Sequence, residues 1–329
     1  MTGNSGSRVF VARKLPGTAL ERLAAQTEMR LWEDPLPPPR ETLLAEAREA
    51  EGLLTLLTDR VDEVLLGVAS RLRAVSNMAV GFDNIDVPAC TRRGILVGNT
   101  PGVLTDTTAD FAFALLMAAA RRVVEGDAFT RAGTWQTWDP GLLLGQDVHG
   151  ATIGIAGMGQ IGQAVARRAH GFDMRILYTD EIPRPEIEAA TGAQRVDLET
   201  LLRESDFVTL HVPLVPETRG LIGAAQLALM KPEAVLINTS RGPVVDQRAL
   251  AEALANGRPG MAALDVTDPE PIAMDDPLLQ LPNAIIAPHI ASGSRATREK
   301  MAEMAVDNLL AGLRGKLPPN CVNPEALGR

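Results

Sequence analysis

Apolar residues in the first eighty positions of the chain fall into short runs separated by segments with helical spacing. The runs predict strands, because a short continuous apolar run is typical of a strand buried in a sheet. The segments between them place apolar residues three or four positions apart, which predicts helices with one buried face. We expect strands at 8–13, 52–57 and 72–78 and helices at 18–25, 40–50 and 61–69. Short strands that alternate with helices indicate a parallel sheet covered by helices on both faces.

The same alternation restarts near residue 150 and predicts a second sheet. Its strands are expected at 152–156, 175–179, 207–211, 235–238, 261–266 and 284–287, with helices at 161–170 and 295–313. Another helix, predicted at 105–122, consists almost wholly of apolar residues. A helix that is apolar on every side is buried, so we expect it between two domains or two subunits. Two domains are also expected because 329 residues exceed what one hydrophobic core usually serves.

The charge and composition of the chain exclude several classes of partner. A formal net charge of −9 and an isoelectric point near 5.1 argue against binding to nucleic acid or to an anionic membrane. No segment reaches the roughly 18 uninterrupted apolar residues of a membrane span, and residues 1–7 are polar. We therefore expect a cytoplasmic protein. Cys90 and Cys321 share no metal-ligand spacing, so no metal site is expected.

A glycine-rich turn between a predicted strand and a predicted helix carries the first chemical signal. Gly157 ends the strand, Gly159 lies in the turn and Gly162 opens the helix. In dinucleotide-binding folds these three positions allow a tight turn, close approach to the pyrophosphate, and close packing of the helix on the strand. The amino terminus of the helix offers free N–H groups to the phosphates. Glycines that serve a turn alone are the alternative, but the strand before them and the helix after them favour a dinucleotide site.

Asp180 predicts which dinucleotide is bound. It follows the next predicted strand, eighteen residues after Gly162, where a carboxylate accepts hydrogen bonds from the adenosine ribose hydroxyls. The same carboxylate repels a 2′-phosphate, and Glu181 adds negative charge beside it. Arginine, the usual partner of that phosphate, comes only at Arg184. The predicted cofactor is therefore NAD, with NADH preferred over NADPH.

Three later segments place charged residues directly after predicted strands. They are LINTSRG with Arg241, ALDVTDPEP with Asp265 and Glu270, and IIAPHIASGS with His289. Open α/β sheets bind their ligands at the carboxyl ends of the strands, so these residues are candidates for catalysis. Each could by itself be a surface charge or a capped loop residue. Their occurrence together, after a dinucleotide motif, favours an active site.

These segments resemble the signature motifs of the D-isomer-specific 2-hydroxyacid dehydrogenase family. The resemblance covers almost the whole chain, and AVGFDNID (79–86), NTPGVLTDTTAD (99–110) and ESDFVTLHVPL (204–214) make it closest to the glyoxylate/hydroxypyruvate reductases. It implies NADH-dependent reduction of a small 2-keto acid, glyoxylate or hydroxypyruvate, to the D-2-hydroxy acid. It also implies two doubly wound parallel-sheet domains with the active site in the cleft between them. Residues 1–98 and 291–329 would bind the substrate, and residues 99–290 would form the NAD-binding Rossmann domain.

The resemblance gives the charged residues their roles. His289 would be the general acid that protonates the carbonyl oxygen during hydride transfer, since histidine titrates near neutral pH. Glu270 would pair with His289, orient its ring and favour the imidazolium. Arg241 would hold the substrate carboxylate and polarise the carbonyl with its planar fork. Asp265 would belong to the outer network near the nicotinamide.

Further contacts are implied in the same way. The backbone N–H groups of Val80 and Gly81 would bind the substrate carboxylate, Leu57 would line the pocket, and Ser292 would add a contact. The segment before Ser292 has Ala291 where many relatives have glycine. The remaining cofactor contacts would come from Thr105, Met158, Gln160, Ile161, His211, Pro213, Thr218, Thr239 and Ser240.

Trp135 and Trp138 stand out in a chain that is only 3% aromatic. In the reductases that this chain resembles, a tryptophan at the position of Trp138 reaches the substrate pocket of the partner subunit, so we expect a homodimer. Packing in a core or an interface is the alternative for both tryptophans.

The sequence argues against some other activities of the family and leaves others as alternatives. A phosphite dehydrogenase has lysine where this chain has Val80, and a formate dehydrogenase has glutamine where it has Glu270. A long phosphoglycerate dehydrogenase would need a regulatory extension beyond residue 329. Short phosphoglycerate dehydrogenases and broad 2-keto-acid reductases remain alternatives. A non-catalytic NAD-sensing corepressor keeps the same catalytic residues, and only the absence of turnover would identify it.

Overall fold

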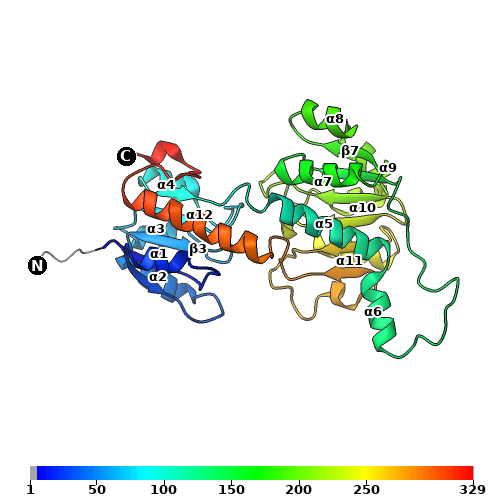
Figure 1. The fold of residues 1–329 in the computed structure, drawn as a ribbon, viewed down its shortest axis with the longest axis horizontal. Helices are drawn as coiled ribbons and strands as arrows, with labels where there is room; N and C mark the ends of the chain where they lie inside the picture. The colour runs from blue at the N-terminus through cyan, green and yellow to red at the C-terminus, as the bar shows by residue number, and fades with distance from the viewer. Residues whose placement is uncertain (1–5, 329) are drawn as a thin grey trace, which may run out of the picture. The chain divides into compact units, whose positions relative to one another are not determined.

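Two parallel sheets, each in its own unit of the chain, form the protein in the computed structural model (Figure 1). One unit combines residues up to Leu104 with those from Gly293 onward, and the other spans Thr105–Ser292. The structure describes residues 6–328, so most of the polar segment 1–7, on which the expectation of a cytoplasmic protein partly rests, lies outside the described part. The α/β fold class predicted from the sequence is confirmed.

The sheet of the first unit has five strands in the order β2-β1-β3-β4-β5. All of its pairings are parallel. This order is one of the two common doubly wound arrangements. The strands are β1 (Arg8–Val11), β2 (Glu28–Leu31), β3 (Gly52–Thr55), β4 (Ala74–Asn77) and β5 (Leu96–Gly98). Every residue of β3 and β4 is buried, as expected for strands covered on both faces.

Helices cover both faces of this sheet. A single buried cluster joins the sheet to α2 (Arg40–Glu49), α3 (Glu63–Val68) and α4 (Val87–Arg92). Helix α12 (Arg295–Leu313), the last long helix, packs on β3, β4 and β5 with α1 (Ala19–Ala24) beside it. A short 3₁₀ helix, η3 (Pro324–Ala326), follows.

The sheet of the second unit has seven parallel strands in the order β12-β11-β10-β9-β6-β7-β8. They are β6 (Thr152–Ala156), β7 (Arg175–Thr179), β8 (Gln194–Arg195), β9 (Phe207–Leu210), β10 (Val235–Asn238), β11 (Met261–Leu264) and β12 (Ala284–Ile286). Strands β7 and β8 follow on one side of β6, and β9 to β12 follow on its other side. The point between β6 and β9 where the order reverses is where doubly wound sheets bind ligands.

Successive strand residues of the second unit enter two different cores. Ile153, Ile155 and Phe207 face a cluster that contains α5 and α7, whereas Val208 and Leu210 face a cluster with α9, α10 and α11. This alternation follows from the two-residue repeat of a strand. The helices of the unit are α5 (Thr105–Ala120), α6 (Val123–Arg131), α7 (Gln160–His170), α8 (Pro185–Thr191), α9 (Leu198–Glu204), α10 (Ala224–Leu229) and α11 (Gln247–Ala255), with 3₁₀ helices η1 (Gly242–Val244) and η2 (Pro277–Gln280).

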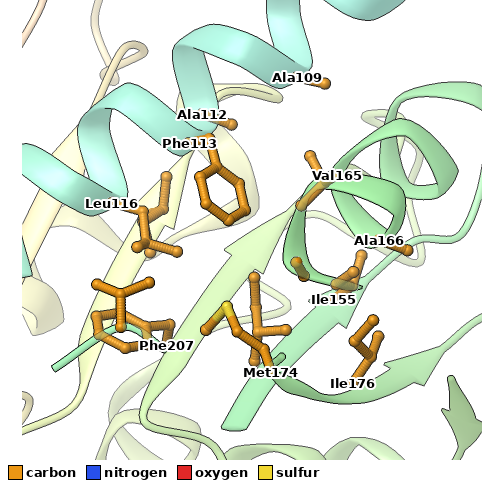
Figure 2. Packing of buried hydrophobic residues seen from close by; sticks show 14 of the residues in the cluster. Ala109, Ala112, Phe113, Leu116, Ile155, Val165, Ala166, Met174, Ile176 and Phe207 are labelled. Carbon is orange, nitrogen blue, oxygen red and sulfur yellow. The ribbon is translucent and has the colours of Figure 1, made fainter. Parts of the chain in front are cut away.

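The apolar helix α5 is buried against the sheet of its own unit. Figure 2 shows Phe113 and Leu116 of α5 directed toward the side chains of α7 and the strands, among them Val165 and Phe207. Phe113 also meets Phe172, with ring centroids 5.1 Å apart. One face of α5 is thus buried within its own unit, whereas Asp106, Asp110 and Ala114 are exposed, so burial on every side is wrong for the unit by itself. A place for the other face between two domains or two subunits stays a prediction.

Candidate functional site

Five predicted site residues form one row at the carboxyl edge of the second sheet. Each is the first residue after a strand, and the row runs Asp180, Gly157, His211, Thr239 and Asp265. Strand register brings them together, because the last residue of each strand pairs with the last residue of its neighbour. The residues that follow these pairs are therefore neighbours as well, on both sides of the point where the strand order reverses.

The three glycines of the turn after β6 have different surroundings. Gly157 has a φ of 93°, and a Cβ there would lie 2.8 Å from the backbone carbonyl of His211. A Cβ at Gly162 would overlap the carbonyl oxygen of Gly157. A Cβ at Gly159 would meet no atom of the described residues within 4 Å. The first and third glycines thus allow the turn to pack, and the second leaves open space beside the backbone at the start of α7.

This edge fits a nicotinamide dinucleotide. The open side of Gly159 lies at the amino terminus of α7, where the first N–H groups have no partner within the helix and attract phosphate. Two buried atoms in the same row, Nδ1 of His211 and Oγ1 of Thr239, have no hydrogen-bond partner among the described residues. Buried polar atoms without a partner are rare in folded proteins and are consistent with a ligand that supplies one.

Asp180 closes the turn from the neighbouring strand. One carboxylate oxygen accepts a hydrogen bond of 2.7 Å from the Met158 N–H, and the other accepts one of 3.0 Å from Ile182. The guanidinium of Arg184 lies 3.6 Å from the second oxygen. Asp180 thus lies beside the glycine turn, with the guanidinium of Arg184 closer to it than the sequence alone suggested. Its predicted contact with the ribose stays a prediction.

The other predicted cofactor residues of the second unit lie on the loops around this row. Thr105 Oγ1 donates to Gln160 Oε1 at 3.3 Å, which ties the start of α5 to the start of α7, where Ile161 also lies. Thr218 donates to the carbonyl of Pro213 at 2.5 Å, so these two residues order the loop after β9. Their contacts to the cofactor stay predictions.

His211 is held as a neutral ring. Its Nε2 lies 2.9 Å from Oγ1 of Thr209, and burial lowers the pKa of His211 to about 3. At neutral pH the ring is therefore the neutral imidazole and not the imidazolium that a general acid would need. Its predicted contact with the cofactor stays a prediction.

His289 and Glu270 form a direct pair. Nδ1 of His289 lies 2.8 Å from Oε2 of Glu270, and both side chains are partly exposed. The other carboxylate oxygen of Glu270 accepts a 3.2 Å hydrogen bond from the Thr267 N–H, which fixes its direction. Because Nδ1 faces Glu270, Nε2 is the nitrogen that can face a substrate. The pairing predicted from the sequence is confirmed.

Asp265 holds the turn that carries His289. Its carbonyl accepts from the His289 N–H at 2.9 Å, and its carboxylate accepts from the N–H groups of Ile290 at 2.8 Å and Ala291 at 2.7 Å. Burial raises the pKa of Asp265, while these two hydrogen bonds oppose the rise. The turn needs such support because His289 has a φ of 54°, a left-handed conformation that costs a non-glycine residue about 1–3 kcal/mol.

Arg241 follows β10 in a turn closed by a residue that the sequence analysis did not single out. Asn238 donates to the Arg241 carbonyl at 2.9 Å and accepts from the backbone N–H of Ser240 at 3.0 Å. Asn238 is buried, so these bonds are shielded from water. The Arg241 guanidinium donates to the Ser240 carbonyl at 2.8 Å.

Gly242 brings the Arg241 turn against the Glu270 turn. A Cβ at Gly242 would overlap the carbonyl oxygen of Thr267, the residue whose N–H orients Glu270. The contact therefore couples the positions of the two charged residues. The glycine directly after Arg241 was the available signal for this contact, but spacing along the chain does not reveal which backbone it approaches.

The predicted substrate residues of the first unit lie on two neighbouring loops. Leu57 follows β3, and Val80 and Gly81 follow β4, which pairs with β3 in parallel up to Thr55 and Asn77. All three are partly buried. Within the described chain, neither the Val80 nor the Gly81 N–H donates a hydrogen bond.

Trp138 does not join the row of the second unit. Its side chain is 78% exposed, on the excursion of the chain between α6 and β6 (Figure 1). That excursion ends at Gln146, which bonds to the backbone of Ala120 and of Glu233 just before β10, at the opposite edge of the sheet from His289. Ser292, the last residue of the unit, is partly buried beyond the His289 turn.

Membrane spans, metal clusters and disulfides are features that other classes of protein function would need. None of the helices within residues 6–328 is long and apolar enough to cross a bilayer. In that same range no cluster of three or more His, Cys, Asp or Glu side chains has the arrangement of a metal site. Both cysteines are free thiols.

Comparison with known proteins identifies relatives over the whole fold. Residues 113–291 match the family described as D-isomer specific 2-hydroxyacid dehydrogenase, NAD binding domain. A glyoxylate reductase of Korarchaeum cryptofilum is 54% identical over 321 residues, 97% of each chain. A glyoxylate reductase of Thermococcus litoralis is 50% identical over 97% of this chain and 98% of its own.

Solved structures agree with these relatives. A Thermus thermophilus protein superimposes with a TM-score of 0.90 at 49% identity, covering 96% of this chain and 99% of its own. An NADPH-dependent glyoxylate/hydroxypyruvate reductase of Sinorhizobium meliloti, solved with NADP and malonate, has a TM-score of 0.84 at 32% identity over 99% of each chain.

Proposed function

Because the chain belongs to the D-isomer-specific 2-hydroxyacid dehydrogenase family, we propose that it reduces glyoxylate to glycolate or hydroxypyruvate to D-glycerate. It is an oxidoreductase of the glyoxylate reductase type, and its NAD-binding domain takes a nicotinamide cofactor. The observation that carries the proposal is the 2.8 Å pair of His289 and Glu270, on the same sheet edge as the glycine turn.

His289 is the proton donor of the proposed reaction. A reduced nicotinamide supplies the hydride, which forms the new C–H bond at the carbonyl carbon. As the carbonyl π bond breaks, its electron pair takes the proton from Nε2 of His289 and becomes the hydroxyl. Glu270 stabilises the imidazolium before the transfer and orients the ring throughout, since its carboxylate accepts from Nδ1.

Arg241 recognises the anionic end of the substrate. Its guanidinium presents several N–H donors in one plane, which suits a carboxylate and the adjacent carbonyl oxygen. The buried bonds of Asn238 hold the Arg241 backbone, so the charge is oriented before the substrate arrives.

Turnover decides between this function and its alternatives. We would follow the loss of NADH absorbance with glyoxylate, hydroxypyruvate, pyruvate and a phosphorylated hydroxypyruvate, and NADH formation from NAD⁺ with phosphite. Preferred reduction of glyoxylate or hydroxypyruvate supports the proposal. A preference for the phosphorylated acid, pyruvate or phosphite would assign the chain to another member of the family. NADH binding without turnover of any of them would favour the corepressor-like alternative.

A preference for NADH over NADPH is part of the proposal. Asp180 lies where a carboxylate meets the adenosine ribose, and it would repel a 2′-phosphate. We expect the KM for NADPH to exceed that for NADH by about tenfold or more, the effect of about 1.4 kcal/mol. The Asp180→Ser variant should raise the KM for NADH and lower that for NADPH, because Arg184 is then released toward the phosphate.

Glu181 offers the control for this experiment. It neighbours Asp180 but is exposed, and its side chain makes no contact with the Met158 N–H. Glu181→Ser should change the ratio of the two KM values far less than Asp180→Ser. Equal effects of the two substitutions would show that general charge, and not the position of Asp180, sets the preference.

A homodimer is the proposed assembly. Large apolar side chains are exposed on α6 and on the excursion that follows it, namely Val123, Val124, Trp135, Trp138, Leu142 and Leu144. Patches of this kind are typical of a protein interface. Sedimentation should give twice the 35.1 kDa mass of one chain.

Trp138 is the residue proposed to reach the substrate site of the partner subunit. Trp138→Ala should lower kcat/KM for glyoxylate by about tenfold, within the range for interface tryptophans, while the dimer persists. Trp135→Ala, three positions away and also exposed, should leave the kinetics nearly unchanged. If both variants keep the native kcat/KM for glyoxylate, both tryptophans are assigned to packing alone.

A further inference from the structure

Three successive backbone carbonyls after β4 are held by hydrogen bonds. The Ala79 carbonyl accepts from the Thr100 N–H at 2.8 Å, and the Val80 carbonyl accepts from the side-chain amide of Asn99 at 2.8 Å. The Gly81 carbonyl accepts from the side-chain amide of Asn77 at 3.0 Å. The loop is thus anchored through its acceptors, while the N–H groups of Val80 and Gly81 donate no bond within the described chain.

The anchored carbonyls determine where the two N–H groups point. In a trans peptide the N–H and the C=O lie in one plane and point in opposite directions. The Val80 N–H shares its peptide with the Ala79 carbonyl, and the Gly81 N–H shares its peptide with the Val80 carbonyl. Both N–H groups are therefore directed away from Asn99 and Thr100. Successive backbone N–H groups that are free to donate can bind one anion together when they point to the same side.

Asn99 also strengthens the donor that it orients. A carbonyl that accepts a hydrogen bond is polarised, and the N–H of the same peptide then donates more strongly. Asn99 is 8% exposed, so water competes little for its amide. The Gly81 N–H is thus both aimed and polarised by one side chain.

The fold keeps Asn99 itself in a defined position. Its N–H donates to the Asn320 carbonyl at 3.2 Å, and its carbonyl accepts from the side-chain amide of Asn308 at 2.7 Å. Asn308 is a buried residue of α12, and its side-chain oxygen accepts from the Asn320 N–H at 3.0 Å. Helix α12 therefore holds Asn99 in place, and Asn99 in turn holds the Val80–Gly81 peptide.

We infer that Asn99 is a positioning residue for the substrate carboxylate. Its amide fixes the Val80–Gly81 peptide so that the Gly81 N–H meets the carboxylate, and the loss of this bond weakens binding of every substrate or inhibitor with that group. This inference rests on the proposed function, in which the substrate is a 2-keto acid. It differs from a general structural role, which would lower stability without a selective effect on anion binding.

The test compares two buried asparagines of the same unit. Asn99→Ser removes the amide at the Val80 carbonyl. Asn323→Ser is the matched control, because the Asn323 amide donates to the Ile95 carbonyl and to Thr91 and, among the described residues, has no hydrogen bond to Val80 or Gly81. Oxalate, a dicarboxylate that cannot be reduced, reports binding of the anion separately from chemistry.

For Asn99→Ser we expect the KM for glyoxylate and the dissociation constant of oxalate to rise together by about tenfold, which corresponds to about 1.4 kcal/mol. The kcat and the dissociation constant of NADH should stay within about twofold of the native values, since uniform binding affects KM alone. Asn323→Ser should leave all four quantities unchanged, whatever it does to the unfolding temperature. If Asn99→Ser does not fold, Asn99→Asp, which keeps the shape of the side chain but cannot donate, takes its place.

The inference is overturned if Asn99→Ser leaves the oxalate constant unchanged, or if Asn323→Ser raises it equally. Calorimetric titration of oxalate into the NADH-loaded protein needs no turnover, so it tests Asn99 even if glyoxylate is not reduced. Absence of glyoxylate turnover with normal oxalate binding would remove the proposed function and keep the role of Asn99 in anion binding. Native protein that binds no oxalate would remove both.

Discussion

Replacement of His289 by asparagine is expected to lower kcat for glyoxylate by about a thousandfold, because general acid catalysis contributes about 10²–10⁴-fold. Asparagine is preferred to alanine for this test. The backbone of His289 has a φ of 54°, which asparagine tolerates and alanine does not. His289→Ala should lose the same activity and also some stability, so a difference in unfolding temperature between the two variants measures the cost of the left-handed turn.

The dissociation constant of NADH should be nearly unchanged in His289→Asn, since within residues 6–328 the His289 side chain is bonded to Glu270 and has no hydrogen bond to the glycine turn. His149→Asn provides the control, because His149 is an exposed histidine just before β6, at the other edge of the sheet. The kcat of Glu270→Gln should lie between that of the native protein and that of His289→Asn, because the His289 ring loses its charged partner but keeps a hydrogen bond. Turnover by His289→Asn close to the native rate would overturn the assignment of the proton donor.

Gly242→Ala is expected to reduce kcat/KM for glyoxylate by about a hundredfold or more, although Gly242 has no part in the chemistry. The added methyl group would overlap the Thr267 carbonyl, so the turns that carry Arg241 and Glu270 must separate. A displacement of about 1 Å in a catalytic group can cost about a hundredfold in rate. Overpacking of this kind also costs about 1–3 kcal/mol of stability.

The measurement combines steady-state kinetics with thermal unfolding. Gly67→Ala is the matched control, since a Cβ at Gly67 in α3 meets nothing within 4 Å of the described residues and its φ is not positive. That variant should be at least as stable as the native protein, because alanine favours a helix over glycine by about 1 kcal/mol. Native kinetics in Gly242→Ala would show that the two turns are not coupled through this contact.

Much of the secondary structure was accessible from the sequence. The strands at 152–156, 175–179 and 235–238 and the helix at 295–313 lie at the residues predicted for them. Buried parallel strands consist of short apolar runs, and a helix of nineteen residues contains several repeats of its apolar spacing, so both signals are strong.

The elements that the sequence analysis missed are short or partly exposed. Strand β2 lies at the edge of its sheet with no buried residue, and helices α8 to α11 have six to nine residues each. So few residues give too few repeats for the spacing to stand out. Their capping residues were the unused signal, since Asp197 and Asp246 each accept a hydrogen bond from the third residue beyond.

The candidate site was likewise predictable from the sequence only in part. The sequence by itself determined which residue types follow each strand, and therefore that Gly157, Asp180, Arg241, Glu270 and His289 are candidates, because strand ends and glycine spacing are local properties. The order of the strands, which makes these residues neighbours, depends on packing between segments far apart in the chain. Only the tertiary structure could decide it.

The supports of the site also belong to the tertiary structure. Asp265 bonds to a turn more than twenty residues away, Gly242 meets Thr267, and Asn99 is held by Asn308 from the final helix. A hydrogen bond or a close contact between distant segments leaves no periodic pattern in either segment. The chemistry of the site could therefore be read from the chain, whereas the geometry that orients it came from the fold alone.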